Sequence, residues 1–158
     1  MERRVQQANP APSRKPRIVI ADDFETLRRG LKSLLGPAIC GEAENGQQAV
    51  EKVMQLRPDI ITLDWTMPVM NGFEAAKMIR SFAPETKIIV FSLHEGNRVR
   101  EEALQAGADV FLHKTATGGT ILKAIADLMG IIRDGSPLVS EVLSTATEQK
   151  KTKPAVTR

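Results

Sequence analysis

The sequence predicts an α/β fold in which helices cover both faces of a parallel sheet. Short apolar runs alternate with segments whose apolar residues recur at spacings of three and four, and this alternation repeats five times between residues 17 and 134. Right-handed crossovers between parallel strands place the intervening helices on both faces of the sheet. The length of 158 residues and the apolar content of 42% suit one domain of ordinary size.

The expected strands are short apolar runs, at 18–21, 39–43, 60–63, 88–91 and 110–113. The expected helices lie near 24–35, 47–56, 72–82, 98–106 and 117–133. Four glycine or proline sites are expected to end a helix or to break the chain before the next strand: Gly36-Pro37, Pro58, Gly107 and Gly135. Helical spacing predicts an inward face in three of them, made of Phe24, Leu27, Leu31, Leu34 and Leu35, then Val50, Val53 and Met54, then Ile121, Ile125, Leu128 and Ile132.

Charge divides the chain into three parts. Residues 1–16 carry a net charge of +3 and residues 135–158 a net charge of +2, which leaves −2 for residues 17–134. We expect 1–16 to be a flexible basic tail, 17–134 to be the folded domain, and 135–158 to be an extension with one short helix near Ser140 and then a disordered basic end. Basic tails can bind nucleic acid, but short ones are more often solvated ends.

No apolar run approaches the length of a membrane span, and the charged amino terminus is unlike a secretory signal, so a cytoplasmic location is expected. The single cysteine, Cys40, cannot form an internal disulfide or a four-ligand zinc site alone, and we expect it to be buried packing.

Reactive side chains stand where four of the expected strands end. Asp22 and Asp23 follow the first strand, Asp64 the third, Ser92 the fourth and Lys114 the fifth. The carboxyl ends of parallel strands lie along one edge of a sheet, so these groups are expected to converge. Together they are the groups that phosphate chemistry on a carboxylate needs.

These positions resemble the receiver domain of two-component response regulators. The resemblance rests on Asp22-Asp23, the run from Asp64 to Gly72 (DWTMPVMNG), Ser92, the stretch AGAD at 106–109, and Lys114, and it covers about 17–134. It implies a flavodoxin-like, doubly wound (βα)5 fold with a five-stranded parallel sheet of order 2-1-3-4-5. It also implies a phosphoacceptor signalling protein rather than an enzyme, phosphorylated by a sensor histidine kinase or a histidine phosphotransfer protein of a phosphorelay.

The same resemblance implies roles for single residues. Asp64 would be the phosphoacceptor, and Lys114 would pair with a phosphoryl oxygen. Mg²⁺ would be held by Asp23, Asp64 and the backbone carbonyl of Thr66, and by Asp22 through a water, since hard oxygen ligands suit this ion.

Switching would follow from the negative charge that phosphorylation adds at Asp64. The resemblance implies that the Ser92 hydroxyl moves toward the phosphoryl group and that Phe111 turns inward. This would alter the face of the fourth helix, fifth strand and fifth helix for a downstream protein target or a homodimer. Leu93 stands where receivers often have alanine or glycine, and we expect it to prolong the phosphorylated state. Thr66 and His94 flank the site and could position or exclude the attacking water.

Three alternatives stay open at this stage. About 24 residues follow Asp134, too few for a DNA-binding domain, so we expect a stand-alone receiver, with a fragment of a longer regulator as the alternative. Thr115, where many receivers have proline, together with Leu93 and Phe111, keeps open an interaction module that is never phosphorylated. An aspartyl-phosphate phosphatase or phosphotransferase would typically carry a second acid two residues after the nucleophile, where this chain has Thr66.

Overall fold

The computed structural model describes residues 15–94 and 96–130. Within them the chain forms one parallel sheet of order β2-β1-β3-β4-β5. The strands are β1 (Ile18–Ala21), β2 (Ile39–Ala43), β3 (Ile60–Asp64), β4 (Lys87–Ser92) and β5 (Val110–His113). The helices are α1 (Glu25–Leu35), α2 (Gly46–Leu56), α3 (Gly72–Phe82), α4 (Asn97–Gln105) and α5 (Gly118–Leu128), with a short 3₁₀ helix at Gly36–Ala38. The predicted order 2-1-3-4-5 is confirmed.

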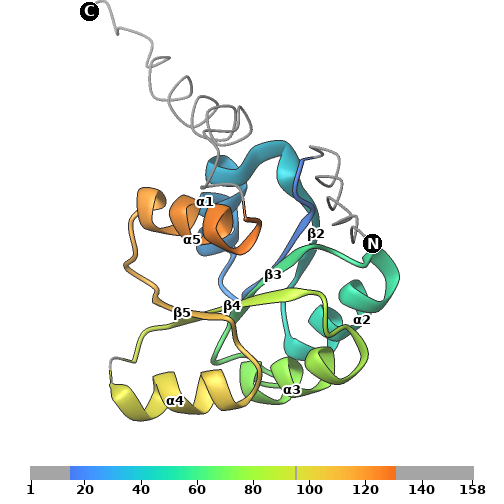
Figure 1. The fold of residues 1–158 in the computed structure, drawn as a ribbon, viewed down its shortest axis with the longest axis vertical. Coiled ribbons are helices and arrows are strands. Elements are labelled where there is room, and N and C mark those ends of the chain that lie inside the picture. The colour runs from blue at the N-terminus through green and yellow to red at the C-terminus, as the bar shows by residue number, and fades with distance from the viewer. Residues whose placement is uncertain (1–14, 95, 131–158) are drawn as a thin grey trace, which may run out of the picture.

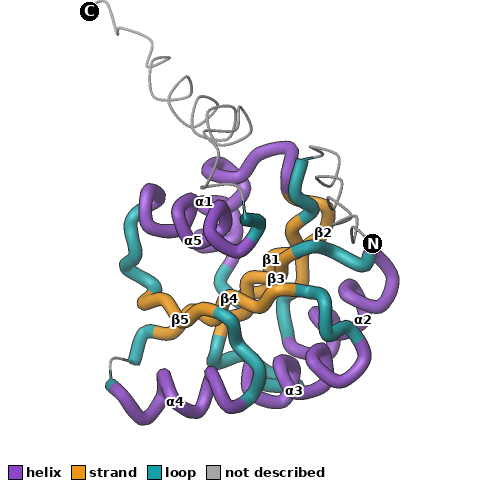
Figure 2. Tube along the Cα trace, viewed as in Figure 1, coloured by secondary structure: helices purple, strands orange, loops and turns teal. Residues whose placement is uncertain are grey.

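The sheet is the middle of three layers. Helices α1 and α5 cover one face and α2, α3 and α4 cover the other (Figure 1), with the strands between them (Figure 2). Successive residues of a strand point to opposite faces, so each central strand contributes side chains to the hydrophobic clusters on both faces of the sheet. Ile18, Ile20 and Ile60 pack toward α1 and α5, whereas Val19 and Ile61 pack in the cluster on the other face. This is why β1 and β3 read as continuous apolar runs.

Two residues that were predicted to face inward are exposed. Phe24 precedes the first turn of α1 in an extended conformation, and 58% of its surface is accessible. Met54 in α2 is 57% exposed, because it follows the buried Val53 by one position and therefore points about 100° away from it. The other residues of these two predicted faces are buried or half-buried: Leu27, Leu31, Leu34 and Leu35 in α1, and Val50 and Val53 in α2.

Strand β2 forms one edge of the sheet and is irregular. Its register with β1 slips between Ile18↔Ile39 and Val19↔Gly41, which leaves Cys40 as a bulge. Cys40 was expected to be buried packing; it packs against the core but is only half-buried. On the same strand, Glu42 forms ion pairs with Lys32 at 2.9 Å and with Arg28 at 3.7 Å.

The predictions for both tails lie largely outside the described residues, as do Ile132 and Gly135 at the predicted end of the last helix. Among the residues that the structure describes, no helix is long and apolar enough to cross a bilayer.

Candidate functional site

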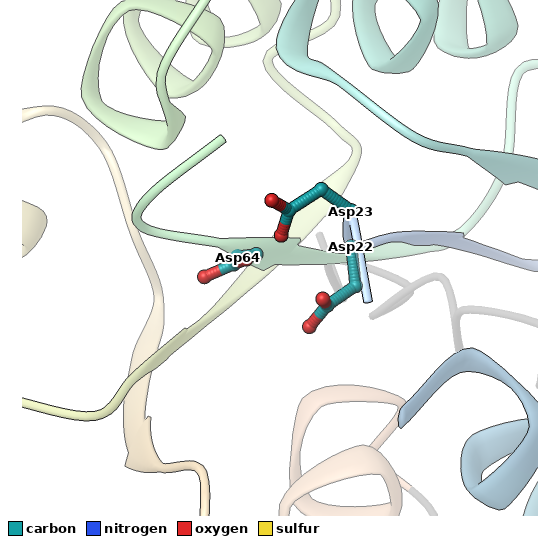
Figure 3. Close-up of side chains that lie close together, drawn as sticks. All are labelled: Asp22, Asp23 and Asp64. Carbon is teal, nitrogen blue, oxygen red and sulfur yellow. The ribbon is translucent and has the colours of Figure 1, made fainter. Parts of the chain in front are cut away.

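Three carboxylates meet at the carboxyl edge of the sheet. Asp22 and Asp23 follow β1, and Asp64 is the last residue of the neighbouring strand β3. One oxygen from each of the three lies within 4.8 Å of the others (Figure 3). Asp22 and Asp64 are buried, and Asp23 is exposed. The convergence predicted from the strand ends is therefore present, with one acid open to solvent.

Lys114 brings a positive charge to this cluster from the end of β5. Its Nζ lies 3.0 Å from Asp64 Oδ2 and 3.1 Å from Asp22 Oδ2. The backbone N–H of Lys114 donates to the Ser92 carbonyl at 2.9 Å, which ties the residue to the end of β4. One buried ammonium thus serves two buried carboxylates.

Burial and charge change the proton affinity of this pair. Burial, and after it the charge of Asp22, raise the pKa of Asp64 to about 6, although the hydrogen bond and charge of Lys114 oppose this change. For Lys114, burial alone lowers the pKa, but the hydrogen bonds and charges of Asp64 and Asp22 outweigh it, so its pKa lies above the ordinary lysine value. Near neutral pH the site holds ionised Asp64 at a free-energy cost.

The oxygens of Asp64 are unequally satisfied. Oδ1 accepts a hydrogen bond from the Thr66 N–H at 3.1 Å. Oδ2 is buried, and apart from its ion pair with Lys114 it has no well-oriented hydrogen-bond donor among the described residues. Asp22 Oδ1 in turn accepts from the Phe24 N–H at 2.8 Å. A buried carboxylate whose Oδ2 has the Lys114 ammonium as its partner, next to two more carboxylates, is a donor set that fits a hard divalent cation.

The loop after Asp64 depends on Gly72, the first residue of α3. The Gly72 N–H donates to the Trp65 carbonyl at 3.0 Å, and a Cβ at Gly72 would overlap the carbonyl oxygen of Asp64. Asn71 caps the helix by accepting from the Glu74 N–H at 2.9 Å. The Asn-Gly pair that was interpreted as turn chemistry therefore also lets the helix approach the backbone of Asp64 closely.

Ser92 and Phe111 lie on β4 and β5. The Ser92 side chain is buried, and its Oγ accepts from the His94 N–H at 3.0 Å, so in this structure it is a satisfied loop hydroxyl. Phe111 is half-buried against the core on the α2, α3 and α4 face. The structure contains no cis peptide bond among its described residues, so the bond before Thr115 is trans.

A cleft of about 560 Å³ opens in front of Asp64. Thr66, Leu93 and His94, the three predicted rate-tuning residues, all line it, together with Asp23. Leu93 is 66% exposed, so most of its side chain stands in solvent at the edge of the cleft.

Two polar residues near the site were missed in the sequence. Arg28 of α1 is buried, and its guanidinium donates to the backbone carbonyl of Asp22 at 2.6 Å while pairing with Glu44 at 3.4 Å. Its position, three residues before Leu31 and seven before Leu35, could have indicated burial. Thr62, two residues before Asp64, is buried as its place in the apolar run 60–63 indicates, but no pattern in the sequence signals that its hydroxyl has no hydrogen-bond partner among the described residues.

Comparison with known proteins gives consistent matches. Residues 18–126 match the family model of the response regulator receiver domain. The chain is 41% identical over 112 residues to the chemotaxis protein CheY of Thermotoga maritima, which covers 69% of this chain and 93% of that protein. Two further curated relatives, LnrK of Bacillus subtilis and NarL of Mycobacterium tuberculosis, are longer, and the chain spans 51% and 57% of their length.

Solved structures agree with these matches. The receiver domain of NarL from Mycobacterium tuberculosis is 34% identical with a TM-score of 0.69, covering 73% of this chain and 97% of that one. The CheX-CheY-BeF3-Mg²⁺ complex of Borrelia burgdorferi contains a chain 26% identical with a TM-score of 0.67, covering 71% of this chain and 87% of that one.

Proposed function

Because this chain belongs to the family of response regulator receiver domains, we propose that it receives a phosphoryl group on Asp64 and passes the signal on by protein contact. The observation that carries the proposal is the ion pair of Lys114 with Asp64 beside the carboxylates of Asp22 and Asp23. The nucleophile Asp64, the counter-charge Lys114 and the candidate metal ligand Asp23 line one cleft, and Asp22 lies beside them.

The transfer step follows from the chemistry of these groups. An Asp64 oxygen attacks the phosphorus of a phosphohistidine, and a P–O bond forms as the P–N bond to the imidazole breaks. The electron pair of the broken bond stays on the imidazole nitrogen. Negative charge accumulates on the transferring oxygens, and the Lys114 ammonium pairs with one of them. Attack needs the ionised carboxylate, and the pKa of about 6 leaves Asp64 mostly ionised at pH 7.

We infer a Mg²⁺ site in the acidic cluster. Asp23, Asp64 and the carbonyl of Thr66 would hold the ion directly, and Asp22 would hold it through a water. The ion supplies positive charge that neutralises the oxygens of the phosphoryl group. The three carboxylate oxygens within 4.8 Å of one another support this assignment, as does the related CheY complex that contains Mg²⁺.

The proposed switch starts at Ser92 and reaches the α4-β5-α5 face through Phe111. The Ser92 Oγ accepts from the His94 N–H, and its own O–H hydrogen is the one that would donate to a phosphoryl oxygen. Movement of Ser92 toward that oxygen would carry a change to the loop before α4 through this bond to His94. The phosphoryl group can shift the equilibrium only through its different contacts in the two states. A downstream protein is the proposed partner of this face, and a second copy of the chain is the alternative occupant.

The proposed setting is a two-component pathway in the cytoplasm. A sensor histidine kinase or a histidine phosphotransfer protein would donate the phosphoryl group at the cleft. The solved complex of the related CheY with CheX supports the expectation that this fold acts by binding other proteins. A phosphorylation-independent module is not favoured, because the acidic set and its lysine are complete. An enzyme of the aspartyl-phosphate class is not favoured, because Thr66 stands where its second acid would be.

Intact-mass measurement tests the proposal. We expect the protein to gain one phosphoryl adduct on incubation with acetyl phosphate and Mg²⁺, and Asp64→Asn to gain none. Asp127→Asn is the matched control, because Asp127 is a half-exposed carboxylate on α5 that pairs with Lys123. Equal adducts on wild type and Asp64→Asn would refute Asp64 as acceptor, and no adduct from acetyl phosphate or from a panel of phosphorylated kinases would refute the function.

A further inference from the structure

A second cleft lies between α1 and α5, the two helices that cover one face of the sheet (Figure 1). Its volume is about 310 Å³, within the range of small-molecule sites. Its apolar wall includes Leu31, Leu34, Phe91 and Ile121. It shares only Leu27 and Lys114 with the lining of the cleft in front of Asp64.

Thr62 gives this cleft an unsatisfied polar atom. Thr62 is 1% exposed and lies in the middle of β3, paired with Ile20 on one side and Ile89 on the other. Its Oγ1 has no hydrogen-bond partner among the described residues, and the residue lines the cleft. A buried hydroxyl without a partner destabilises a fold. Because Oγ1 is enclosed in this structure, a rotation of the Thr62 side chain toward the cleft would accompany binding, and an oxygen atom of a bound molecule would then supply the missing partner.

The charged groups of the cleft are already paired. Asp22 and Lys114 both line it and lie 3.1 Å apart, and Lys114 also pairs with Asp64 at 3.0 Å, so the lining holds no unpaired cation for an anionic ligand. The ammonium of Lys114 has three hydrogens, and its two ion pairs leave one N–H for a further acceptor. An uncharged molecule with one oxygen therefore matches the polar atoms that the cleft offers.

Gly30 leaves one wall of the cleft open. Gly30 lies in the interior of α1, is exposed, and a Cβ there would meet no atom within 4 Å. A glycine in a helix interior is less favourable than alanine, and here its effect is to keep one wall of the cleft free of side chains. Gly118 begins α5, and a Cβ there would come within 3.1 Å of Leu34 Cδ1, so this glycine lets α5 approach Leu34 of α1 closely.

We propose that the cleft between α1 and α5 is a second binding site, which takes a compact, uncharged aromatic or branched apolar molecule carrying one hydroxyl or carbonyl oxygen. The apolar body packs against Leu31, Leu34 and Ile121, and the oxygen bonds to Thr62 Oγ1 and Lys114 Nζ. Because Lys114 also faces Asp64, an occupied cleft would compete with a phosphoryl group for this ammonium. That consequence rests on the proposed function, whereas binding itself does not.

The binding test uses phenol, with toluene as a probe of the same shape that lacks the oxygen. Both are titrated into the full, unphosphorylated chain without Mg²⁺, and amide shifts are followed by NMR. Phenol should give saturable shifts at Thr62, Gly30 and Ile121. Thr62→Val should weaken phenol about fivefold, the effect of one ordinary hydrogen bond, and change toluene by less than about twofold.

A variant that fills the cleft provides a second test of binding. Gly30→Phe should weaken phenol at least about tenfold by filling the mouth, whereas Ser33→Phe adds the same side chain to the same helix at an exposed residue outside the cleft lining and should bind as wild type. Circular dichroism verifies that each variant is folded. The proposal is overturned if phenol shifts scatter outside the cleft or persist unchanged in Gly30→Phe. A crystal soaked in phenol that holds only water between α1 and α5 would overturn it as well.

Discussion

Lys114 Nζ lies 3.0 Å from Asp64 Oδ2, and the two side chains are only 9% and 2% exposed. The ammonium sits where a divalent cation would also act on Asp64. The Lys114 ammonium and a divalent cation are both positive and compete for the Asp64 carboxylate. Lys114 must therefore weaken metal binding, while it favours phosphorylated Asp64.

Lys114→Met should therefore bind Mg²⁺ about tenfold more tightly than wild type, since one positive charge is removed from the site. Trp65, the single tryptophan of the chain and the neighbour of Asp64, reports binding by its fluorescence. Lys123→Met, which removes an exposed lysine of α5, should leave the affinity unchanged. Unchanged or weaker binding in Lys114→Met would contradict the competition.

The pKa of Asp64 predicts how the stability of the metal-free protein depends on pH. A carboxyl group whose pKa rises from 3.8 to about 6 on folding binds more protons in the folded state between these values. The contribution of Asp64 to the free energy of unfolding is therefore largest below about pH 4 and is lost as the pH rises through about 6, by up to about 3 kcal/mol.

Urea unfolding between pH 4 and 8 in the presence of a chelator measures this dependence. Asp64→Asn removes the titrating group, so the difference between the two proteins isolates it. Mg²⁺ should restore stability to wild type above pH 6, because the ion binds the ionised form. A difference curve that is flat across this range would show that burial does not raise the pKa of Asp64.

Leu93 at the edge of the cleft should slow hydrolysis of the phosphorylated state by restricting the approach of water. Leu93→Ala should then shorten the lifetime of the phosphorylated protein about threefold or more, on the order of 1 kcal/mol in the barrier. Loss of the adduct is followed by intact mass. Leu104→Ala on α4, also a partly exposed leucine, is the control. Equal lifetimes for wild type and Leu93→Ala would assign no such role to Leu93.

Gly72→Ala should destabilise the protein by about 1–3 kcal/mol, because the new methyl group overlaps the Asp64 carbonyl and forces α3 or the end of β3 to shift. Chemical unfolding measures the loss. Gly30→Ala, whose methyl group meets open space, should be neutral or stabilising. If both substitutions had the same effect, helix propensity rather than close approach would explain Gly72.

Much of this arrangement could be predicted from the sequence because it depends on short, strong patterns. The continuous apolar runs located every strand to within one residue, and the polar residues at their ends located the acidic cluster. A strand end fixes where a side chain emerges, so Asp22, Asp64 and Lys114 could be brought together without coordinates.

The remainder depends on packing that no periodicity encodes. Phe24 and Met54 stand at the margins of amphipathic stripes, where a shift of one residue moves a side chain from core to solvent. The burial of Arg28 depends on carbonyl and carboxylate partners from other elements. The cleft beside Thr62 depends on the distance between α1 and α5, two helices separated by most of the domain in sequence.

The irregular strand β2 bears on how this domain behaves at high concentration. An edge strand with a flat row of unpaired peptide groups is a template for the edge of a neighbouring molecule, and such pairing leads to aggregation. Here the bulge at Cys40 breaks the row, and the paired charges of Glu42 and Lys32 make the approach of a foreign strand unfavourable. The bulge and the charges of β2 therefore disfavour pairing between molecules at this edge of the sheet.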